Sequence, residues 1–273
     1  MTQDSAAGPG TAAGPISQQA ARTWIERWDA QQQVVMHDRE ERFTALIDVV
    51  ELASARPDPL VIDLGCGPGS LGARLLDRLP RARVVGIDAD PLLLALAEAA
   101  DGWRPGLRLA DADLRVAGWS AALALPEAAD AAVSTTALHW LQGDELAAMY
   151  AELATVLRPG GLLLNGDHLT SDEHSDPVLA RLEQQMREHA DRRAFPGGHD
   201  ESWRGWWDAV TADPALAGAA AERDRRHYSA DHHRSESTLL RTHVDALRAA
   251  GFAEVGTLWQ HGNSRLLCAV LGG

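Results

Sequence analysis

Two carboxylates and a run of glycines are the residues of this chain whose types and spacing could do chemistry. Asp63 precedes Gly65-Cys-Gly-Pro-Gly69, and Asp88 ends the next apolar run, Val84-Val-Gly-Ile-Asp88. The glycines allow a tight turn and let a ligand approach the backbone without interference from Cβ atoms. Asp63 is a good neighbour for an ammonium group, and Asp88 stands where ribose hydroxyls could donate hydrogen bonds to it. The pattern therefore predicts a nucleoside site.

A strand, a helix and a second strand must position these groups. Val61–Leu64 is apolar and β-branched at its start, which is typical of a buried strand. Pro68 suits the first turn of a following helix, because its missing N–H would be unpaired there anyway. Helical spacing then appears in Leu71, Leu75, Leu76 and Leu79. The order strand, glycine loop, helix, strand predicts a βαβ unit.

The glycine spacing bears on which nucleoside is bound. A dinucleotide fingerprint would read G-x-G-x-x-G/A and leave a helix N-terminus open to a pyrophosphate. Here Ser70 stands in the third-glycine position. Asp63, two residues before the first glycine, would repel a pyrophosphate at close range. An NAD-linked oxidoreductase is therefore the alternative within enzymes, and it is disfavoured.

The sequence Asp63-Leu-Gly-Cys-Gly-Pro-Gly69 resembles motif I of the class I S-adenosylmethionine-dependent methyltransferases. The resemblance spans residues 59–165 and 235–271. It implies a Rossmann-like α/β fold with a doubly wound, seven-stranded, mostly parallel sheet and a reversed final hairpin. The resemblance also implies cofactor-binding residues. For the methionine end they are Asp63, Gly65, Cys66, Gly67 and Gly69, and for the ribose they are Asp88 and Ala89.

Later segments fall in the order that the family expects. After the third strand, Asp113 and Leu114 take the positions that contact adenine, by side chain and backbone respectively. Ser134, at the end of the fourth strand, is a further cofactor candidate. Thr135-Thr-Ala-Leu-His-Trp-Leu141 resembles the fourth motif of the small-molecule branch, whose members often have leucine-histidine-tryptophan here.

The chain outside the nucleoside core divides by composition and pattern. Ala, Gly, Pro and Ser dominate its first residues and predict a disordered tail. The connection after the fifth strand is long enough to be a lid. We expect a disordered tail over 1–15, a helical cap over 16–56, the core over 57–168, a helical lid over 169–234, and a helix and hairpin completing the core over 235–273.

The lid carries tryptophans at helical spacing. Trp203, Trp206 and Trp207 stand at i, i+3 and i+4, on one face of a predicted helix. This face either packs on the sheet domain, which we expect of at least two of the three, or forms an aromatic wall for a flat or apolar acceptor. Trp28 of the cap has the same two interpretations. The candidates for acceptor contact are Trp28, Trp140, His168, Trp203 and Trp207.

His139 is the candidate general base. It follows the fourth strand, at the carboxyl edge where open α/β sheets bind ligands, and imidazole can take a proton near neutral pH. Alternatively, His139 and Trp140 shape the pocket without proton transfer. His168, just after the fifth strand, is the second choice of base. A carboxylate or neutral amine acceptor would need no base, because alignment of donor and acceptor could suffice.

The composition of the chain restricts the classes of partner that we expect it to bind. The formal charge is −14, which disfavours nucleic acid, since its recognition needs a basic footprint. Two cysteines give no disulfide framework and favour the cytoplasm. No apolar run reaches the length of a membrane helix, so no membrane partner is expected. His227, His232 and His233 lack converging ligands, so no metal is expected either.

The sequence thus predicts transfer of a methyl group from S-adenosylmethionine, giving S-adenosylhomocysteine, to a small organic acceptor such as a specialised metabolite. Besides the oxidoreductase, two alternatives stay open. One is a non-catalytic S-adenosylmethionine-binding module. The other is a methyltransferase acting on a protein tail, which an acidic surface would attract. The oligomeric state is not predicted.

Overall fold

A single seven-stranded sheet organises the protein. The computed structural model describes residues 15–36, 38–102, 104–195, 201–226 and 238–273. The strand order is β3-β2-β1-β4-β5-β7-β6, with β1 to β5 parallel and β7 antiparallel to both neighbours. The strands are β1 (Leu60–Leu64), β2 (Arg83–Asp88), β3 (Leu107–Asp111), β4 (Ala129–Thr135), β5 (Leu157–His168), β6 (Phe252–His261) and β7 (Ser264–Leu271). The predicted doubly wound, mostly parallel fold with a reversed last hairpin is confirmed.

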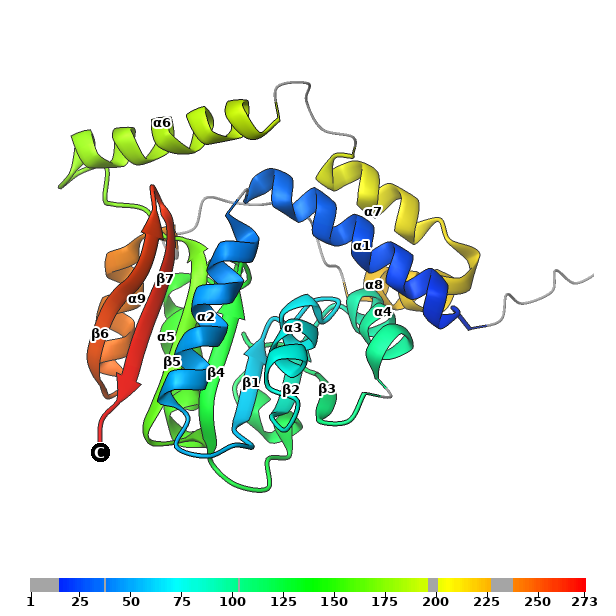
Figure 1. The fold of residues 1–273 in the computed structure, drawn as a ribbon, viewed down its shortest axis with the longest axis horizontal. Coiled ribbons are helices and arrows are strands. Elements are labelled where there is room, and N and C mark those ends of the chain that lie inside the picture. Colours follow the sequence, from blue (N-terminus) through cyan, green and yellow to red (C-terminus); the bar gives the residue numbers. More distant parts are fainter. Residues whose placement is uncertain (1–14, 37, 103, 196–200, 227–237) are drawn as a thin grey trace, which may run out of the picture.

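Helices cover both faces of this sheet, with α2 and α3 on one side and α5 and α9 on the other (Figure 1). The remaining helices gather beyond the carboxyl ends of the strands or flank the sheet. The helices are α1 (Gln18–Val35), α2 (Arg39–Ala53), α3 (Ser70–Arg78), α4 (Pro91–Asp101), α5 (Gly143–Val156), α6 (Pro177–Ala194), α7 (Trp203–Thr211), α8 (Ala217–Arg225) and α9 (Leu240–Ala249). Short 3-10 turns are η1 (Trp119–Leu123), η2 (Leu138–Trp140) and η3 (Pro214–Leu216).

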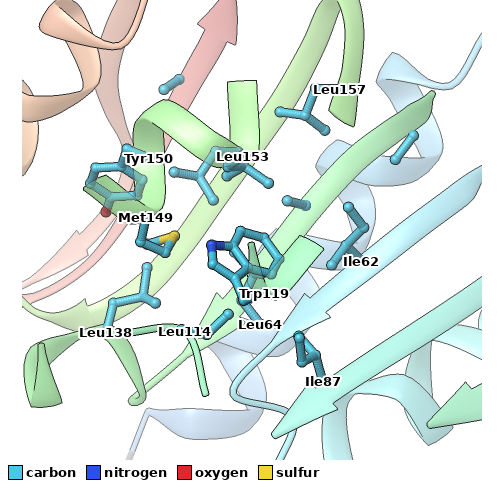
Figure 2. Packing of buried hydrophobic residues seen from close by; sticks show 14 of the residues in the cluster. Ile62, Leu64, Ile87, Leu114, Trp119, Leu138, Met149, Tyr150, Leu153 and Leu157 are labelled. Carbon is cyan, nitrogen blue, oxygen red and sulfur yellow. The ribbon is translucent and has the colours of Figure 1, made fainter. Parts of the chain in front are cut away.

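Strand β1 shows why the core holds the site in place. All five of its residues are buried, because helices cover both faces of the sheet. Ile62 and Leu64 pack with the α5 side, in the cluster shown in Figure 2, whereas Val61 packs with α2 and α3. Side chains alternate along a strand, so Asp63 shares the face of Val61. That face is the α2 and α3 side, away from α5.

The cap and the lid meet over α4. Helix α1 contacts both α4 and α7, and the three helices share an apolar cluster. Trp206 is fully buried there and donates from Nε1 to the carbonyl of Trp24 at 3.3 Å. Trp24 in turn donates from Nε1 to Asp213 at 2.8 Å. Helix α2 leaves this group and packs against the sheet, on the side of β5 and β7.

Two expectations concern residues outside the described ones. Most of the predicted tail, residues 1–14, and the histidines at 227, 232 and 233 are among them. Over the residues that the structure does describe, none of the helices combines the length and the apolar character needed to cross a bilayer.

Candidate functional site

A cavity of about 780 Å³ opens at the carboxyl ends of β1 to β4, where parallel sheets bind ligands. The loops after these four strands line it on one side. Helices α1, α7 and α8 and the start of α2 line it on the other. The predicted residues that the structure brings together in this lining are Trp28, Gly65, Cys66, Gly67, Asp88, Ala89, Asp113, Leu114, His139, Trp140, His168, Trp203 and Trp207.

The glycine loop needs its glycines for two separate reasons. Gly65, Gly67 and Gly69 have φ of 67°, 54° and 86°, in the left-handed region that side chains disfavour. A Cβ atom at Gly65 would also collide with the Cβ of Ala137, in the loop after β4. Gly69 caps α3 and does not itself line the cavity. The loop is therefore fixed by backbone geometry, and the backbone of Gly65 to Gly67 faces the cavity region.

Asp88 is held by backbone donors at the end of β2. Its Oδ2 accepts from Gly67 N at 2.7 Å, and its Oδ1 accepts from Asp90 N at 2.8 Å. Burial raises the pKa of Asp88 to about 6, so the carboxylate is the dominant form at neutral pH. These contacts tie the glycine loop to the second strand and leave a half-buried acceptor at the cavity wall.

Besides Gly69, two more predicted cofactor residues, Asp63 and Ser134, lie away from the cavity lining. Asp63 is 1% exposed and lies against α3, where a Cβ on Gly72 would be 3.6 Å from its Oδ2. Neither of its oxygens has a hydrogen-bond partner among the described residues. Burial, helped by the charge of Asp88, raises the pKa of Asp63 to about 7. Ser134 is also buried and donates to the carbonyl of Leu64 at 2.8 Å, joining the ends of β4 and β1.

The loop after β3, which lines the cavity, contains an ion pair between Asp113 and Arg115 that was not predicted from the sequence. Asp113 accepts from Arg115, at 2.9 Å and 3.1 Å from Nε and at 2.6 Å from Nη2. Leu114 between them is buried and lines the cavity. The Asp113 carboxylate, which the resemblance assigns to adenine, therefore already accepts from the charged Arg115. The only feature of the sequence that could have predicted this ion pair is that the two residues are close together in the chain.

His139 pairs with a buried carboxylate, Asp167, at the end of β5. Its Nδ1 lies 3.0 Å from both Asp167 oxygens. Although burial alone would raise the pKa of Asp167, the charges of His139 and Arg42 hold it below its ordinary value. An ionised carboxylate only accepts, so Nδ1 carries the proton and Nε2 is left as the basic nitrogen. The sequence reasoning missed Asp167, although an acid at a strand end was a usable signal.

The two histidines of the cavity differ in basicity. Burial alone would lower the pKa of His139, but Asp167 raises it above the ordinary value. The pKa of His168 is lowered to about 4 by burial and by the charge of Arg42. Arg42 is fully buried and donates to Thr135 Oγ1 at 3.1 Å. His168 is therefore neutral at physiological pH and a weak base, whereas His139 is a competent one.

Aromatic rings form part of the cavity wall, called the aromatic wall below, which consists of Trp28, Trp203 and Trp207. Trp28 lies 5.3 Å from Trp203 between ring centroids, and Trp203 lies 5.6 Å from Trp207. Trp206, the third tryptophan of α7, is buried behind them and packs on Trp28 at 4.8 Å. Trp140 stacks on His139 at 5.5 Å and stays 37% exposed. Trp206 therefore packs within the protein, whereas Trp203 and Trp207 line the cavity.

Three arginines line the cavity, and the sequence reasoning missed all of them. Arg39 pairs with Asp29 at 2.9 Å, and Arg223 pairs with Asp90 at 2.6 Å. The third is Arg115, described above. They come from α2, from α8 and from the loop after β3, so no sequence spacing links them. Each guanidinium has a carboxylate partner within the protein, which balances charge across the cavity.

A metal centre was not expected from the sequence. Within the described ranges, no group of three or more His, Cys, Asp or Glu side chains is arranged to hold a metal ion. Cys66 and Cys268 are free cysteines, and burial raises the pKa of the Cys66 thiol well above its ordinary value. Cys66 is therefore a packing residue of the loop and a poor nucleophile.

Comparison with known proteins gives a family match over the core. Residues 61–161 match the model of the methyltransferase domain family. Trans-aconitate 2-methyltransferase of Azoarcus sp. (strain BH72) is 36% identical over 136 residues, which are 50% of this chain and 49% of that protein. The chain thus spans about half the length of the curated relatives it matches.

Solved structures share the fold at low identity. The S-adenosylmethionine-dependent methyltransferase SibL, in its apo form, has a TM-score of 0.53 at 18% identity, covering 85% of this chain and 55% of that one. Human N-acetylserotonin methyltransferase, solved in complex with SAM, has a TM-score of 0.51 at 16% identity, covering 94% of this chain and 61% of that one. At these identities the likeness establishes the fold alone.

Proposed function

Because residues 61–161 match the model of the methyltransferase domain family, we propose that this protein transfers a methyl group from S-adenosylmethionine to a small organic acceptor. The observation that carries the proposal is one cavity lined by both the glycine loop with Asp88 and the His139 imidazole. Its volume, about 780 Å³, is in the range of small-molecule sites. The aromatic wall supplies the apolar surface that such a site uses.

The cofactor would lie along the strand ends. Backbone groups of Gly65 to Gly67 suit its methionine part, Asp88 with Ala89 suits the ribose, and Asp113 with Leu114 suits the adenine. Asp63 has no part in this proposed contact with the ligand, since its side chain lies against α3. When bound, the sulfonium supplies an activated methyl group, so the protein has to align the acceptor and exclude water.

His139 would act on an acceptor whose nucleophile carries a proton. Its Nε2 removes that proton from a hydroxyl or a carbon acid, and Asp167 stabilises the imidazolium that forms. His168, neutral and in the same lining, offers a hydrogen bond to the acceptor instead. Trp28, Trp203 and Trp207 would bound a flat acceptor, with Trp140 beside the base.

A carboxylate acceptor is the second candidate. One relative is named for trans-aconitate, and the cationic Arg39 is among the residues that line the cavity. A carboxylate would be methylated without a base. The partners of Arg39, Arg115 and Arg223 argue against it, because each arginine is already paired with an acid.

Calorimetry and labelled methyl transfer test the proposal. S-Adenosylhomocysteine should bind and NAD should not; tight binding of NAD alone would leave an oxidoreductase. Transfer from methyl-labelled S-adenosylmethionine should appear with aryl hydroxyls rather than with trans-aconitate or extracted polypeptides. Binding of the cofactor without transfer to any acceptor would leave a non-catalytic module.

We also propose that the reaction needs no metal and takes place in the cytoplasm, where free cysteines stay reduced. Turnover should therefore be unchanged after treatment with EDTA and removal of the chelate by gel filtration. Loss of turnover that added Mg²⁺ or Zn²⁺ restores would contradict the metal-free reaction. No nucleic-acid partner is proposed, given the formal charge of −14.

A further inference from the structure

Arg223 of α8 lies between the aromatic wall and the cofactor end of the cavity. Its guanidinium carbon is 3.9 Å from the ring centroid of Trp207, so the two planar groups are in cation–π contact. On its other side, its Nε donates to Asp90 Oδ2 at 2.6 Å. Arg223 and Trp207 both line the cavity, and both side chains are largely buried. One side chain thus joins two surfaces from segments more than a hundred residues apart.

Asp90 connects this contact to the residue that faces the ribose position. Its backbone N–H donates to Asp88 Oδ1 at 2.8 Å, while its own Oδ1 caps α4 through Leu92 N at 2.9 Å. Asp88 is held in turn by Gly67 N at 2.7 Å. A continuous chain of short contacts therefore runs from the glycine loop, through Asp88 and Asp90, to Arg223 and the wall at Trp207.

A second arginine of the same helix end provides an internal contrast. Arg226 pairs with Asp111 at 2.7 Å and 2.8 Å and donates to the Ala89 carbonyl at 3.0 Å. It therefore also ties α8 to the strand ends beside the cofactor position. Arg226 is not among the residues lining the cavity, and the ring of Trp207 is contacted by Arg223 instead. Arg226 attaches the helix without touching the aromatic wall.

We propose that Arg223 is a positioning residue that couples the acceptor wall to the cofactor loop, so that an occupied cofactor site orders Trp207 and α7. The proposal rests on the proposed function, since it takes S-adenosylmethionine as the ligand beside Asp88. Coupling of this kind is reciprocal, and the bound acceptor equally strengthens retention of the cofactor. The consequence is that an aromatic acceptor meets a fully formed wall only after the cofactor has bound.

Hydrogen–deuterium exchange of the full chain tests this without a known acceptor. Calorimetry first fixes a saturating concentration of S-adenosylhomocysteine for each variant. In the wild-type protein, saturation should slow exchange of the α7 amides, residues 203–211, by about fivefold or more, the lower end of ordinary intersite coupling. Circular dichroism confirms that each variant is folded.

Three variants separate positioning from mere attachment. Arg223→Lys keeps the charge opposite Asp90 but loses the planar face on Trp207. Asp90→Asn keeps an N-cap for α4, because asparagine caps as well as aspartate, but removes the charge that holds Arg223. Arg226→Lys perturbs the attachment of α8 alone. The first two should reduce the slowing at α7 to less than about twofold, and Arg226→Lys should leave it near the wild-type value.

The outcomes distinguish the two proposals. If S-adenosylhomocysteine does not bind the wild-type protein, the proposed function fails. If it binds but α7 exchange is unchanged, or if Arg223→Lys and Asp90→Asn both keep the wild-type slowing, the coupling role of Arg223 is wrong and the methyltransferase proposal stands. Equal loss in Arg226→Lys and Arg223→Lys would also overturn it, since simple attachment of α8 would then explain the effect.

Discussion

The proposed cofactor end and the proposed acceptor end of the cavity are built by different means. The methionine and ribose parts of the cofactor end are built on backbone: the left-handed glycines Gly65 and Gly67 line the cavity, and two amides, those of Gly67 and Asp90, hold Asp88. The acceptor end consists of side chains from α1, α7, η2 and β5, brought together by packing. A backbone site tolerates few substitutions and serves one ligand, whereas a side-chain site can change its ligand residue by residue.

The largest expected effect lies at the acceptor end. His139→Ala should lower turnover by about 10²–10⁴-fold, the usual contribution of a general base, while the affinity for S-adenosylhomocysteine stays near wild type. Steady-state kinetics and calorimetry measure the two quantities. His168→Ala is the comparison variant: its imidazole lines the same cavity and is proposed to hydrogen-bond the acceptor, but it is a weak base, so its loss should affect acceptor binding more than turnover. Equal losses in turnover and cofactor affinity for His139→Ala would show a packing role and remove the distinction between the two ends.

Next in size is a change of backbone. Gly65→Ala combines a left-handed φ of 67° with a Cβ that would collide with Ala137, so affinity for S-adenosylhomocysteine should fall about 100-fold. Gly218→Ala, in α8 with open space around it, should bind normally. Calorimetry on both variants checks this. Normal binding by Gly65→Ala would mean that the loop can shift, and that the cofactor end is less rigid than its geometry indicates.

Asp88→Ala should have a smaller effect on the same measurement. Loss of a charged acceptor of two hydrogen bonds is expected to weaken S-adenosylhomocysteine binding by roughly 1.5–3 kcal/mol. Its effect on turnover at saturating cofactor should be slight, because the base and the wall are intact. An unchanged dissociation constant would remove Asp88 from the site.

The smallest expected effect is a pH dependence that belongs to the cofactor end. The pKa of Asp88 is raised to about 6, so the ionised acceptor is present above that pH and is lost as the pH falls through it. Affinity for S-adenosylhomocysteine should therefore decline below about pH 6 and be steady above it. As the pH is lowered, turnover should begin to fall at a higher pH than cofactor binding does. The reason is that the base must be unprotonated and the pKa of His139 lies above its ordinary value. Asp88→Asn should abolish the binding dependence and leave that of turnover; two coincident profiles would contradict the separate assignments.

The sequence also allowed more to be predicted about the proposed cofactor end of the cavity than about the proposed acceptor end. The loop after β1, Asp88 and the fold could be predicted because their signals are local: glycine spacing, strand runs and helical periodicity. Asp63 could not be placed, since a strand buried on both faces gives no alternation to tell which side its carboxylate takes. Strand β5 begins at Leu157, directly after α5, although Arg158-Pro-Gly-Gly161 is typical of a break, and its regular pairing with β4 continues from Leu162 after a register shift.

The acceptor end could be predicted only in its residue types. His139 and the lid tryptophans were recognisable as candidates, but the partners that decide their roles lie far away in the sequence. Asp167 determines the tautomer of His139 from 28 residues downstream, and Arg223 reaches Asp90 across 133 residues. Such pairs form only when the fold brings distant segments together, and the spacing of residues in a single sequence does not predict which segments meet.

The interlocked tryptophans of α1 and α7 have a practical consequence for anyone redesigning acceptor preference. Trp206 donates to the Trp24 carbonyl, and Trp24 donates to Asp213, so each segment supplies what the other lacks. A graft that replaces only 201–226 with a stretch lacking the equivalent of Asp213 would leave the indole N–H of Trp24 without its acceptor. We therefore expect that working chimaeras have to exchange residues 15–36 and 201–226 together, although the two segments are far apart in the sequence.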